Sequence, residues 1–484
     1  MSEGRPQARP GRTEGGPRGG DSRGEPASVR WYHRLVTADT EAEEQLGGAR
    51  RVASGGLRLM AANALQSAGD QVVNAKTVLP WLLTLLGAPA ALVGLLVPVR
   101  ESGSMLPQAA LTPWVLRAPR RTRVWMVGAT GQGLATLGMA AAATFAEGLL
   151  AGVLVVTALA VFALARALCS MASKDVQGRA VPKGQRGQVT GIATAVSGIV
   201  AVVLGVALQR LGQDLDVAVL AALLVGAALT WFIGVAVYAG IPESPEGPSS
   251  DPRGGRRAGP DAGGQRRGEG SEAGREDRGT GAGSSWVRDT LTLLGTDREF
   301  RHFVVARALL LVSALAPPFL VTLAADRGSS WLAGLGAFVI AQGVASVVGG
   351  RVFGRLADRS SRLVMVVGAA AASLVVLLVV WVVVAGADVL VLPALVGGYL
   401  VISLVHVGVR VARKTYVVDM AEGDLRTRYV ATANTAMGVI LLVTGAVSAG
   451  LATLGEVPAL VFLAVLGLVG AAVSWRLPEV SGRG

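Results

Sequence analysis

The sequence predicts an all-α membrane protein with twelve transmembrane helices in two pseudo-symmetric six-helix bundles. Three observations predict this fold: an apolar composition, twelve long apolar stretches whose connecting loops alternate in charge, and an internal repeat. Of 484 residues, 51% are hydrophobic and only 16% are charged, whereas charged residues make up about 25% of an average soluble domain. Lipid is therefore the expected solvent for most of this chain.

Each apolar stretch is long enough to cross a bilayer, which takes about 20 mainly apolar residues in a helix. In the first half the stretches cover residues 60–86, 89–112, 124–145, 149–173, 187–208 and 217–241. In the second half they cover residues 302–324, 331–350, 363–385, 389–411, 429–452 and 457–476. An even number of spans places both ends of the chain on one side of the membrane.

The loops between these stretches alternate in charge. Loops after the even-numbered stretches carry Arg117, Arg120, Arg121, Arg123, Lys174, Arg179, Lys183, Arg186, Arg355, Arg359, Arg362, Arg413, Lys414, Arg426 and Arg428. Loops on the other side carry Arg210 and Arg327 beside Glu147, Asp214, Asp216, Asp326, Asp388 and Glu456. Because Lys and Arg concentrate in cytoplasmic loops, we expect a multi-pass protein of the cytoplasmic (inner) membrane with both termini in the cytoplasm.

Polar segments flank and separate the apolar ones. Residues 1–56 are expected to form a largely disordered cytoplasmic tail, since the first 30 residues are mainly Gly, Pro, Arg and Glu. Residues 57–241 and 301–477 form the two six-helix bundles. Residues 242–300 form a disordered cytoplasmic linker with a short amphipathic helix near residues 286–296. Residues 478–484 form a second cytoplasmic tail.

Composition and motifs exclude several classes of function. The net charge of +12 lies in loops and tails rather than on an amphipathic fold, so we expect no nucleic-acid partner. The sequence has no phosphate-binding glycine loop, no metal-ligand cluster and no constellation of acid, base and nucleophile. We therefore expect no cofactor, no metal and no enzyme activity. The single cysteine, Cys169, lies inside an apolar stretch and is expected to be a packing residue.

The two halves match at a constant shift of 240 residues. Residues 186–200 lie over residues 426–440, and Arg166 lies over His406. A parallel repeat of this kind implies a symmetry axis along the membrane normal and a cavity between the halves near the bilayer midplane.

A short motif between the eighth and ninth stretches carries a resemblance to a known family. Residues 354–362, GRLADRSSR, are similar to the G-x-x-x-D-R-x-G-R loop signature of the major facilitator superfamily, with Ser361 where the glycine usually stands. The resemblance implies a transporter fold with a cytoplasmic gate formed by Gly354, Asp358, Arg359 and Arg362. In that gate Asp358 would bond Arg362 and face a helix N-terminus, where a carboxylate is favoured. The alternative is a solvated turn with a local ion pair.

Two local patterns predict departures from regular helix packing. Residues 97–108 contain two prolines and a glycine, so a kink or unwound turn is expected where backbone can line a cavity. In the fifth stretch Gly191, Gly198 and Gly205 recur every seven residues, which predicts a seam of close helix packing.

Polar residues inside the apolar stretches predict the path of a solute. A charge at the bilayer centre costs about 2.5–3.5 kcal/mol on insertion scales, so it persists where it faces a cavity or a partner. Asn63, Gln66, Asp70 and Asn74 are spaced at three and four residues and share one helix face. We interpret this face as cavity lining, with Asp70 as a proton carrier.

The other candidates for the substrate and proton pathway are Lys76, Arg100, Glu101, Ser104, Gln108, Arg166 and His406. Two alternatives remain open. Arg100 could form a purely structural ion pair with Glu101 or Asp70, and His406 could be a structural hydrogen-bond partner.

Together these features predict a secondary active transporter of a small organic solute. It would work by alternating access in the lipid bilayer, as a monomer coupled to protons. Deep cations outnumber deep acids, which favours an anionic or zwitterionic solute. The alternatives are multidrug-type efflux of lipophilic compounds, and a non-transporting membrane sensor or assembly protein on the same fold.

Overall fold

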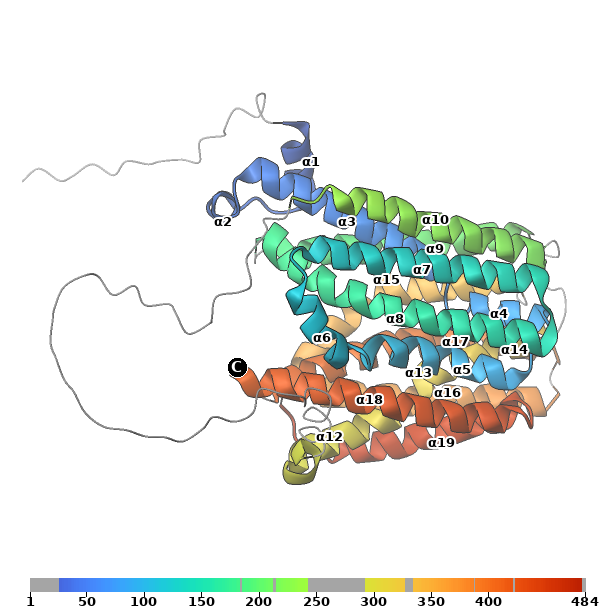
Figure 1. Ribbon diagram of the computed structural model, residues 1–484. Helices are drawn as coiled ribbons and strands as arrows, with labels where there is room; N and C mark the ends of the chain where they lie inside the picture. The colour runs from blue at the N-terminus through green and yellow to red at the C-terminus, as the bar shows by residue number, and fades with distance from the viewer. Residues whose placement is uncertain are drawn as a thin grey trace, which may run out of the picture.

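Helices form almost all of the described protein (Figure 1). The structure is a computed structural model that describes residues 26–182, 185–211, 215–242, 292–326, 334–386, 388–420 and 423–480. No strand occurs in these ranges. Most of the expected linker, residues 243–291, and the last four residues of the expected C-terminal tail lie outside them.

The helices follow the chain in two sets. The first set is α1 (Ala27–Leu35), α2 (Thr40–Gln45), α3 (Ala49–Val72), α4 (Val78–Leu85), α5 (Ala90–Met105), α6 (Gln108–Arg117), α7 (Arg121–Phe145), α8 (Gly148–Ala180), α9 (Arg186–Leu211) and α10 (Val217–Ala239). The second set is α12 (Arg298–Leu309), α13 (Val312–Leu315), α14 (Pro317–Ala325), α15 (Leu335–Arg359), α16 (Ser361–Val384), α17 (Asp388–Asp419), α18 (Gly423–Ala452) and α19 (Glu456–Trp475).

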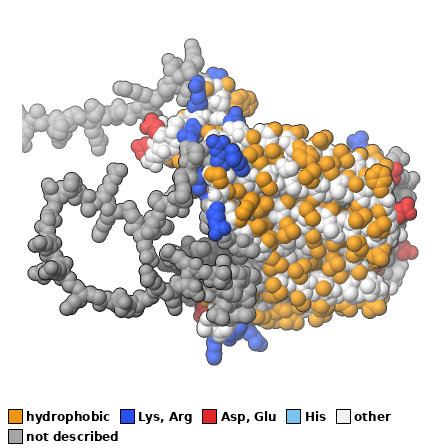
Figure 2. Space-filling model, viewed as in Figure 1, with side chains coloured by type: hydrophobic (Ala, Val, Ile, Leu, Met, Phe, Trp, Pro, Cys, Tyr) orange, Lys and Arg blue, Asp and Glu red, His pale blue; other side chains and the backbone are white. Residues whose placement is uncertain are grey.

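Seven helical segments in the described ranges are long and apolar enough to cross a bilayer. They are Gly148–Ala180, Val217–Ala239, Arg298–Ala325, Ser361–Val384, Asp388–Val417, Thr432–Ala452 and Glu456–Trp475. Apolar side chains form a wide belt on the face shown in Figure 2. Many large apolar side chains are exposed, among them Phe145 at 86% and Val389 at 88%. Water opposes the exposure of so large an apolar surface, so the chain is a multi-pass membrane protein.

Three of the expected stretches are broken rather than continuous helices. Residues 60–86 divide into α3 and α4, residues 89–112 divide into α5 and α6, and residues 302–324 divide into α12, α13 and α14. Proline accounts for two of the breaks, since Pro107 precedes α6 and Pro317 opens α14. A proline has no N–H to donate and clashes with the preceding turn. The break in the second stretch agrees with the predicted kink. The breaks in the first and seventh stretches were not predicted, although the seventh still forms one segment of membrane-spanning length, Arg298–Ala325.

The two halves of the chain meet along closely packed helix pairs. α5 packs against α18, and α9 packs against α15. A Cβ atom at Gly205 of α9 would lie 2.7 Å from the backbone N of Ile340, and a Cβ at Gly445 of α18 would collide with Pro98. Gly198 approaches α15 in the same way. The predicted glycine seam is therefore confirmed at Gly198 and Gly205, and it joins the two halves.

Charges are distributed unequally between the two ends of the belt. Lys and Arg side chains gather at the end where α1 and the C-terminus lie (Figures 1 and 2). Acidic side chains, with few basic ones, lie at the opposite end in the same view. The loops thus segregate by charge in the fold as they do along the sequence.

Residues 27–56, part of the tail expected to be largely disordered, form α1, α2 and the start of α3, and α1 and α2 pack on α3. Val29 and Tyr32 form the buried face of α1, and Val36, which follows the helix, is buried beside them. Tyr32 packs against Gly56 of α3, and its hydroxyl donates to Oε1 of Gln185 at 2.7 Å. The average composition of the tail hides this short amphipathic helix, whose apolar residues are spaced at three and four positions.

Candidate functional site

Three charged side chains from three helices meet inside the first half. Asp70 lies near the end of α3, Arg100 lies on α5 and Arg166 lies on α8. Nη1 of Arg166 donates to both carboxylate oxygens of Asp70 at 2.5 Å. Nη2 of Arg100 donates to Oδ1 of Asp70 at 3.2 Å. The carboxylate of Asp70 therefore accepts hydrogen bonds from two guanidinium groups. The cluster of one acid and two arginines has a net positive charge.

This cluster is partly accessible rather than sealed in dry packing. The exposed fractions of the side chains are 14% for Asp70, 15% for Arg100 and 33% for Arg166. The outer face of α8 carries the exposed Val161 and Leu164. Arg166 lies roughly 200° around the helix from Leu164, so its exposed third faces the inside of the molecule. Water can therefore reach the cluster from within the bundle.

Aromatic packing holds one of the two arginines in place. The guanidinium of Arg100 lies 5.9 Å from the centre of the Phe162 ring. Phe162 in turn meets Trp231 edge-on, with ring centres 5.3 Å apart. A cation over an aromatic face gains electrostatic stabilisation from the ring, so α8 and α10 orient Arg100 toward Asp70.

A second acid, Glu101, follows Arg100 on α5 and forms no direct ion pair with the residues that the structure describes. The strongest positive charges acting on it are those of Lys76 and Arg100 from the first half, followed by Arg410 from the second. Lys76 lies in the unwound turn between α3 and α4, where its backbone N donates to Oδ1 of Asn74 at 2.9 Å. Asn74 was expected on the helix face of Asp70. Because α3 ends two residues before it, Asn74 closes this turn instead.

The second half contributes a basic face on α17. His406, Arg410 and Arg413 are spaced at four and three residues and so share one side of the helix. Arg410 is exposed and lies about 180° around α17 from Val401 on the outer face. Nδ1 of His406 lies 3.3 Å from the hydroxyl of a serine on α13. The charge of Lys76 also acts on His406, so groups of both halves surround one site.

Four other predicted residues lie on α3, α5 and α6, and two of them make local contacts with the backbone. Oγ of Ser104 donates to a backbone oxygen three residues earlier at 2.8 Å, and Nε2 of Gln108 donates to the backbone oxygen of Ser104 at 2.6 Å. Gln66 contacts Cys169, which is buried as a packing residue. Asn63 is half-buried on α3. Ser104 and Gln108 thus bond the backbone around the break between α5 and α6.

Sequence reasoning missed a neutral polar cluster in the second half. Oε1 of Gln342 on α15 accepts hydrogen bonds from the hydroxyls of Tyr399 at 3.0 Å and Ser403 at 3.4 Å. Nε2 of Gln342 lies 3.4 Å from Oγ of Ser346. These residues carry no charge, so the cost of placing a charge in lipid does not single them out in the sequence. The pairs Gln342/Ser346 and Tyr399/Ser403 are each spaced four residues apart on an apolar helix. This spacing is the sequence signal that points to the cluster.

Arg307 on α12 was also missed. It is 8% exposed, and its Nη2 donates to Oδ1 of Asn434 at 3.1 Å. Its Nε has no hydrogen-bond partner in the described protein. A buried cation without an acidic partner adds to the positive field of the second half. The described ranges contain no group of three His, Cys, Asp or Glu residues arranged to hold a metal ion.

The motif expected in a loop is mostly helical. α15 continues to Arg359 and α16 begins at Ser361, so Ser360 alone connects them. Arg359 is exposed. The surroundings of Gly354 and the side chain of Asp358 lie outside the described part of the chain, so the predicted contact of Asp358 with a helix N-terminus stays a prediction.

Arg362 contacts the C-terminal segment of the chain. Its Nη1 donates to the backbone O of Leu477 at 3.1 Å, and its Nε lies 3.5 Å from Oε2 of Glu479. The hydroxyl of Ser360 also donates to Glu479. The residues that follow α19 are therefore attached to the turn between α15 and α16, which the sequence did not indicate.

No family model matches the sequence, and no curated protein matches it. Solved structures, in contrast, match along most of the chain. A POT family transporter in complex with a thioalcohol-conjugated peptide is 11% identical, with a TM-score of 0.64 over 87% of this chain and 95% of its own. A D-xylose–proton symporter is 13% identical, with a TM-score of 0.62 over 88% of this chain and 99% of its own. The nucleoside transporter NupG is 14% identical, with a TM-score of 0.59 over 87% of this chain and 98% of its own.

All three are transporters of the major facilitator fold. This chain has that fold. The resemblance inferred from the motif and the repeat is thereby confirmed at the level of architecture. Identities this low establish a fold and not an activity, which depends on the residues of the site.

Proposed function

We propose that this major facilitator protein is a secondary active transporter of a small organic solute, working by alternating access and coupled to protons. Its twelve spans form two bundles, residues 57–241 and 301–477, in the cytoplasmic membrane, with both termini in the cytoplasm. The observation that carries the proposal is the shared carboxylate of Asp70. It lies between Arg100 and Arg166 on the inner face of one half, opposite the basic face of the other.

Asp70 carries the proton in this proposal. When ionised, it holds the guanidinium groups of Arg100 and Arg166. Protonation removes its negative charge and frees both arginines to bind an anionic group of the solute or to change partners. A proton that binds one conformation more tightly than the other shifts the balance between them, which couples the proton gradient to the solute.

The contacts at the two ends of the molecule support an inward-facing state. Residues 317–324 of α14 are all buried, and α14 packs against α4 of the other half. These helices are equivalent in the repeat, since residues 78–85 lie over residues 318–325 at the shift of 240. At the end that bears the termini, in contrast, Arg410 and Lys414 of α17 are exposed. α4 and α14 thus close the far end while the cytoplasmic end stays accessible.

The charges around the site favour an anionic or zwitterionic solute. The basic residues are Lys76, Arg100, Arg166, Arg410 and Arg413, and the acids are Asp70 and Glu101. Guanidinium groups bind carboxylates and phosphates through paired hydrogen bonds. Because the two halves of one chain supply both walls of the site, we propose that the transporter acts as a monomer.

Proton coupling is tested with purified protein in proteoliposomes under an imposed pH gradient. A thermal-shift panel of small carboxylates and phosphates, set against lipophilic cations, first identifies a solute. We expect the wild type to accumulate this solute only with the gradient. Asp70→Asn should abolish that accumulation while solute exchange without a gradient persists, because the residue can no longer lose a proton. Asp388→Asn, an exposed acid at the start of α17, is the matched control and should behave as wild type.

Three results would overturn the proposal. Unchanged coupling in both Asp70→Asn and Glu101→Gln would remove the proton pathway from this site. Stabilisation by lipophilic cations alone would favour multidrug-type efflux instead, and the absence of any solute flux from reconstituted, folded protein would favour a sensor or assembly protein.

A further inference from the structure

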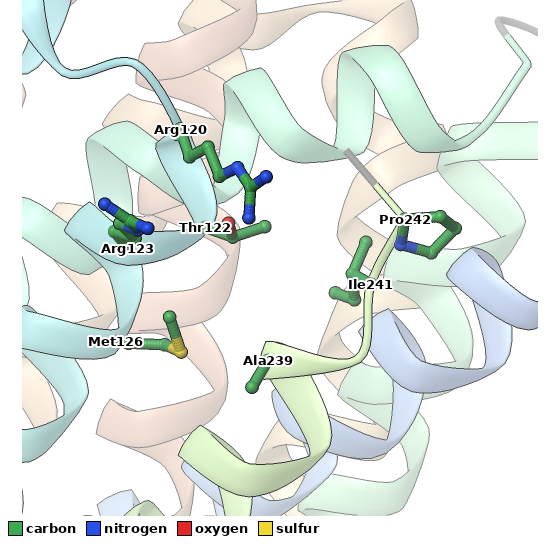
Figure 3. A pocket seen from close by; sticks show the side chains of 7 residues that line it. All are labelled: Arg120, Thr122, Arg123, Met126, Ala239, Ile241 and Pro242. Atoms are coloured by element: carbon green, nitrogen blue, oxygen red, sulfur yellow. The ribbon is translucent and has the colours of Figure 1, made fainter. Parts of the chain in front are cut away.

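Two cavities lie side by side at the cytoplasmic end of α7 and share the arginines Arg120 and Arg123. The first has a volume of about 240 Å³ and lies between the start of α7 and the segment that follows α10 (Figure 3). In it Arg120 and Thr122 face Ile241 across the opening (Figure 3). The second has a volume of about 290 Å³ and extends from the same two arginines toward Trp114 and Val127. Neither belongs to the site around Asp70.

The arginines of these cavities lack acidic partners. Arg117, Arg120 and Arg123 are all exposed, and none of them forms an ion pair with a residue in the described part of the chain. Arg121, which lies between them in the sequence, is different: its Nε contacts Oδ2 of Asp175 at 2.7 Å. Three unpaired guanidinium groups around one opening produce a strong positive potential. They fit a phosphate group, which guanidinium binds through two parallel hydrogen bonds.

The walls beside the arginines are apolar and face lipid. Trp114 is 49% exposed and Val127 is 57% exposed. On α7, Arg123, Val127, Leu134 and Phe145 are spaced at four, seven and eleven residues and so lie along one helix face. Leu134 and Phe145 are exposed in the apolar belt, so Arg123 marks the place where this lipid-facing row reaches the polar rim. Tryptophan is common at that depth, where the headgroups of the bilayer begin.

We propose that the two cavities form a binding site for an anionic phospholipid of the cytoplasmic leaflet. Arg117, Arg120 and Arg123 hold its headgroup phosphates, and an acyl chain lies against Trp114 and Val127. A soluble phosphate would gain nothing from the apolar wall, whereas a lipid uses both the charges and the wall. This inference depends on the membrane fold and is independent of the transport proposal.

The test compares lipids on purified protein in a neutral detergent, with the unfolding midpoint as the readout. Phosphatidylglycerol should raise the midpoint of the wild type by several degrees, and neither phosphatidylcholine nor glycerol 3-phosphate should match it. The variant Arg120→Gln/Arg123→Gln should lose at least half of the shift. Arg476→Gln should keep it, because Arg476 is an exposed arginine beside an exposed tryptophan that lines neither cavity. Equal shifts in the double variant and the wild type, or an equal shift with glycerol 3-phosphate, would overturn the proposal.

A second measurement does not depend on thermal stability. Lipids with brominated acyl chains quench tryptophans that they touch, and the difference between the wild type and Trp114→Phe isolates the contribution of Trp114. We expect brominated phosphatidylglycerol to quench Trp114 at least twofold more strongly than brominated phosphatidylcholine. Arg120→Gln/Arg123→Gln should remove this preference. Equal quenching of Trp114 by the two lipids would show a surface that does not select anionic headgroups.

Discussion

Asp70 is the one negative charge that Arg100 and Arg166 share, so the three residues of the cluster are not equivalent. Without Arg166, Asp70 keeps its ion pair with Arg100 at 3.2 Å. Without Arg100, Asp70 keeps its ion pair with Arg166 at 2.5 Å. Loss of the acid leaves two partly buried guanidinium groups facing each other without a counter-charge. An uncompensated buried charge is more costly than a missing ion pair.

We therefore expect Asp70→Asn to lower the thermal unfolding midpoint more than Arg166→Gln does. The cost of Asp70→Asn should be about 1–3 kcal/mol, since it removes the negative charge that both arginines contact and one of the two acceptor oxygens. The double variant Asp70→Asn/Arg166→Gln should be more stable than Asp70→Asn alone, because the repulsion between the arginines is removed. Scanning fluorimetry in detergent measures all four proteins of this cycle. A double variant whose loss equals the sum of the single losses would show that the residues do not interact.

At the scale of residues, the sequence predicted which charged side chains belong to the site better than it predicted the contacts that each residue makes. Asp70, Arg100 and Arg166 stand out in apolar stretches because a charge in lipid needs a partner, and the structure brings them together. The orientation expected for Asn74 failed because it depends on where α3 ends. That position is set by packing against other helices and is not visible in the spacing of residues along one of them.

Among the elements, the pair α1 and α2 is held on the first half by a buried polar network. Glu43 and Gln185 are each 1% exposed. Nε2 of Gln185 donates to Oε1 of Glu43 at 2.7 Å, and Nε2 of His33 lies 3.1 Å from Oε2 of the same carboxylate. Tyr32 donates its hydroxyl to Gln185 at 2.7 Å. Burial, together with the charge of Glu43, raises the pKa of Tyr32, so its hydroxyl remains a donor at all physiological pH values.

Gly56→Ala should detach α1, because a Cβ at residue 56 would occupy the place of the Tyr32 ring. Trypsin cleavage after Arg30 and Arg34 should then become at least tenfold faster. Gly55→Ala is the matched control on the same helix, since a Cβ there would lie 3.5 Å from Ala180 in ordinary contact. Tyr32→Phe should give an intermediate rate, because one hydrogen bond contributes about 1 kcal/mol, or roughly a fivefold change in the open population. Equal cleavage of the Gly56→Ala and Gly55→Ala proteins would contradict this packing.

Element boundaries show what the sequence alone could and could not predict. The apolar stretches locate the helices because hydrophobic length is a local property of the chain. Their ends extend beyond the apolar parts, since α8 continues to Ala180 and α17 to Asp419. Hydropathy cannot predict such extensions, because a helix that projects into water is stabilised by backbone hydrogen bonds and packing rather than by apolar residues.

The whole molecule is held in one state by contacts between its halves. α5 with α18, α9 with α15, and α4 with α14 all join residues of the first half to residues of the second. The pair α4 and α14 lies at the end of the belt opposite the termini, where buried apolar side chains such as Leu82 and Leu320 fill the interface. The repeat predicted the equivalence of these two helices. It could not predict which end is closed, because both states of a rocking transporter satisfy the same symmetry.

The proposed inward-facing state predicts a difference in chemical accessibility that cysteine labelling can measure. Leu320 on α14 is fully buried, whereas Arg410 on α17 is exposed. A membrane-impermeant maleimide should therefore modify Arg410→Cys at least tenfold faster than Leu320→Cys, and it should do so only from the cytoplasmic side of oriented vesicles. The native Cys169 is 2% exposed, so the wild type should label slowly and provides the background, with Cys169→Ser as the control. Rapid labelling of Leu320→Cys from the opposite side, with Arg410→Cys protected, would mean that the protein rests open to the outside. In that case the assignment of α4 and α14 to the closed gate would be wrong.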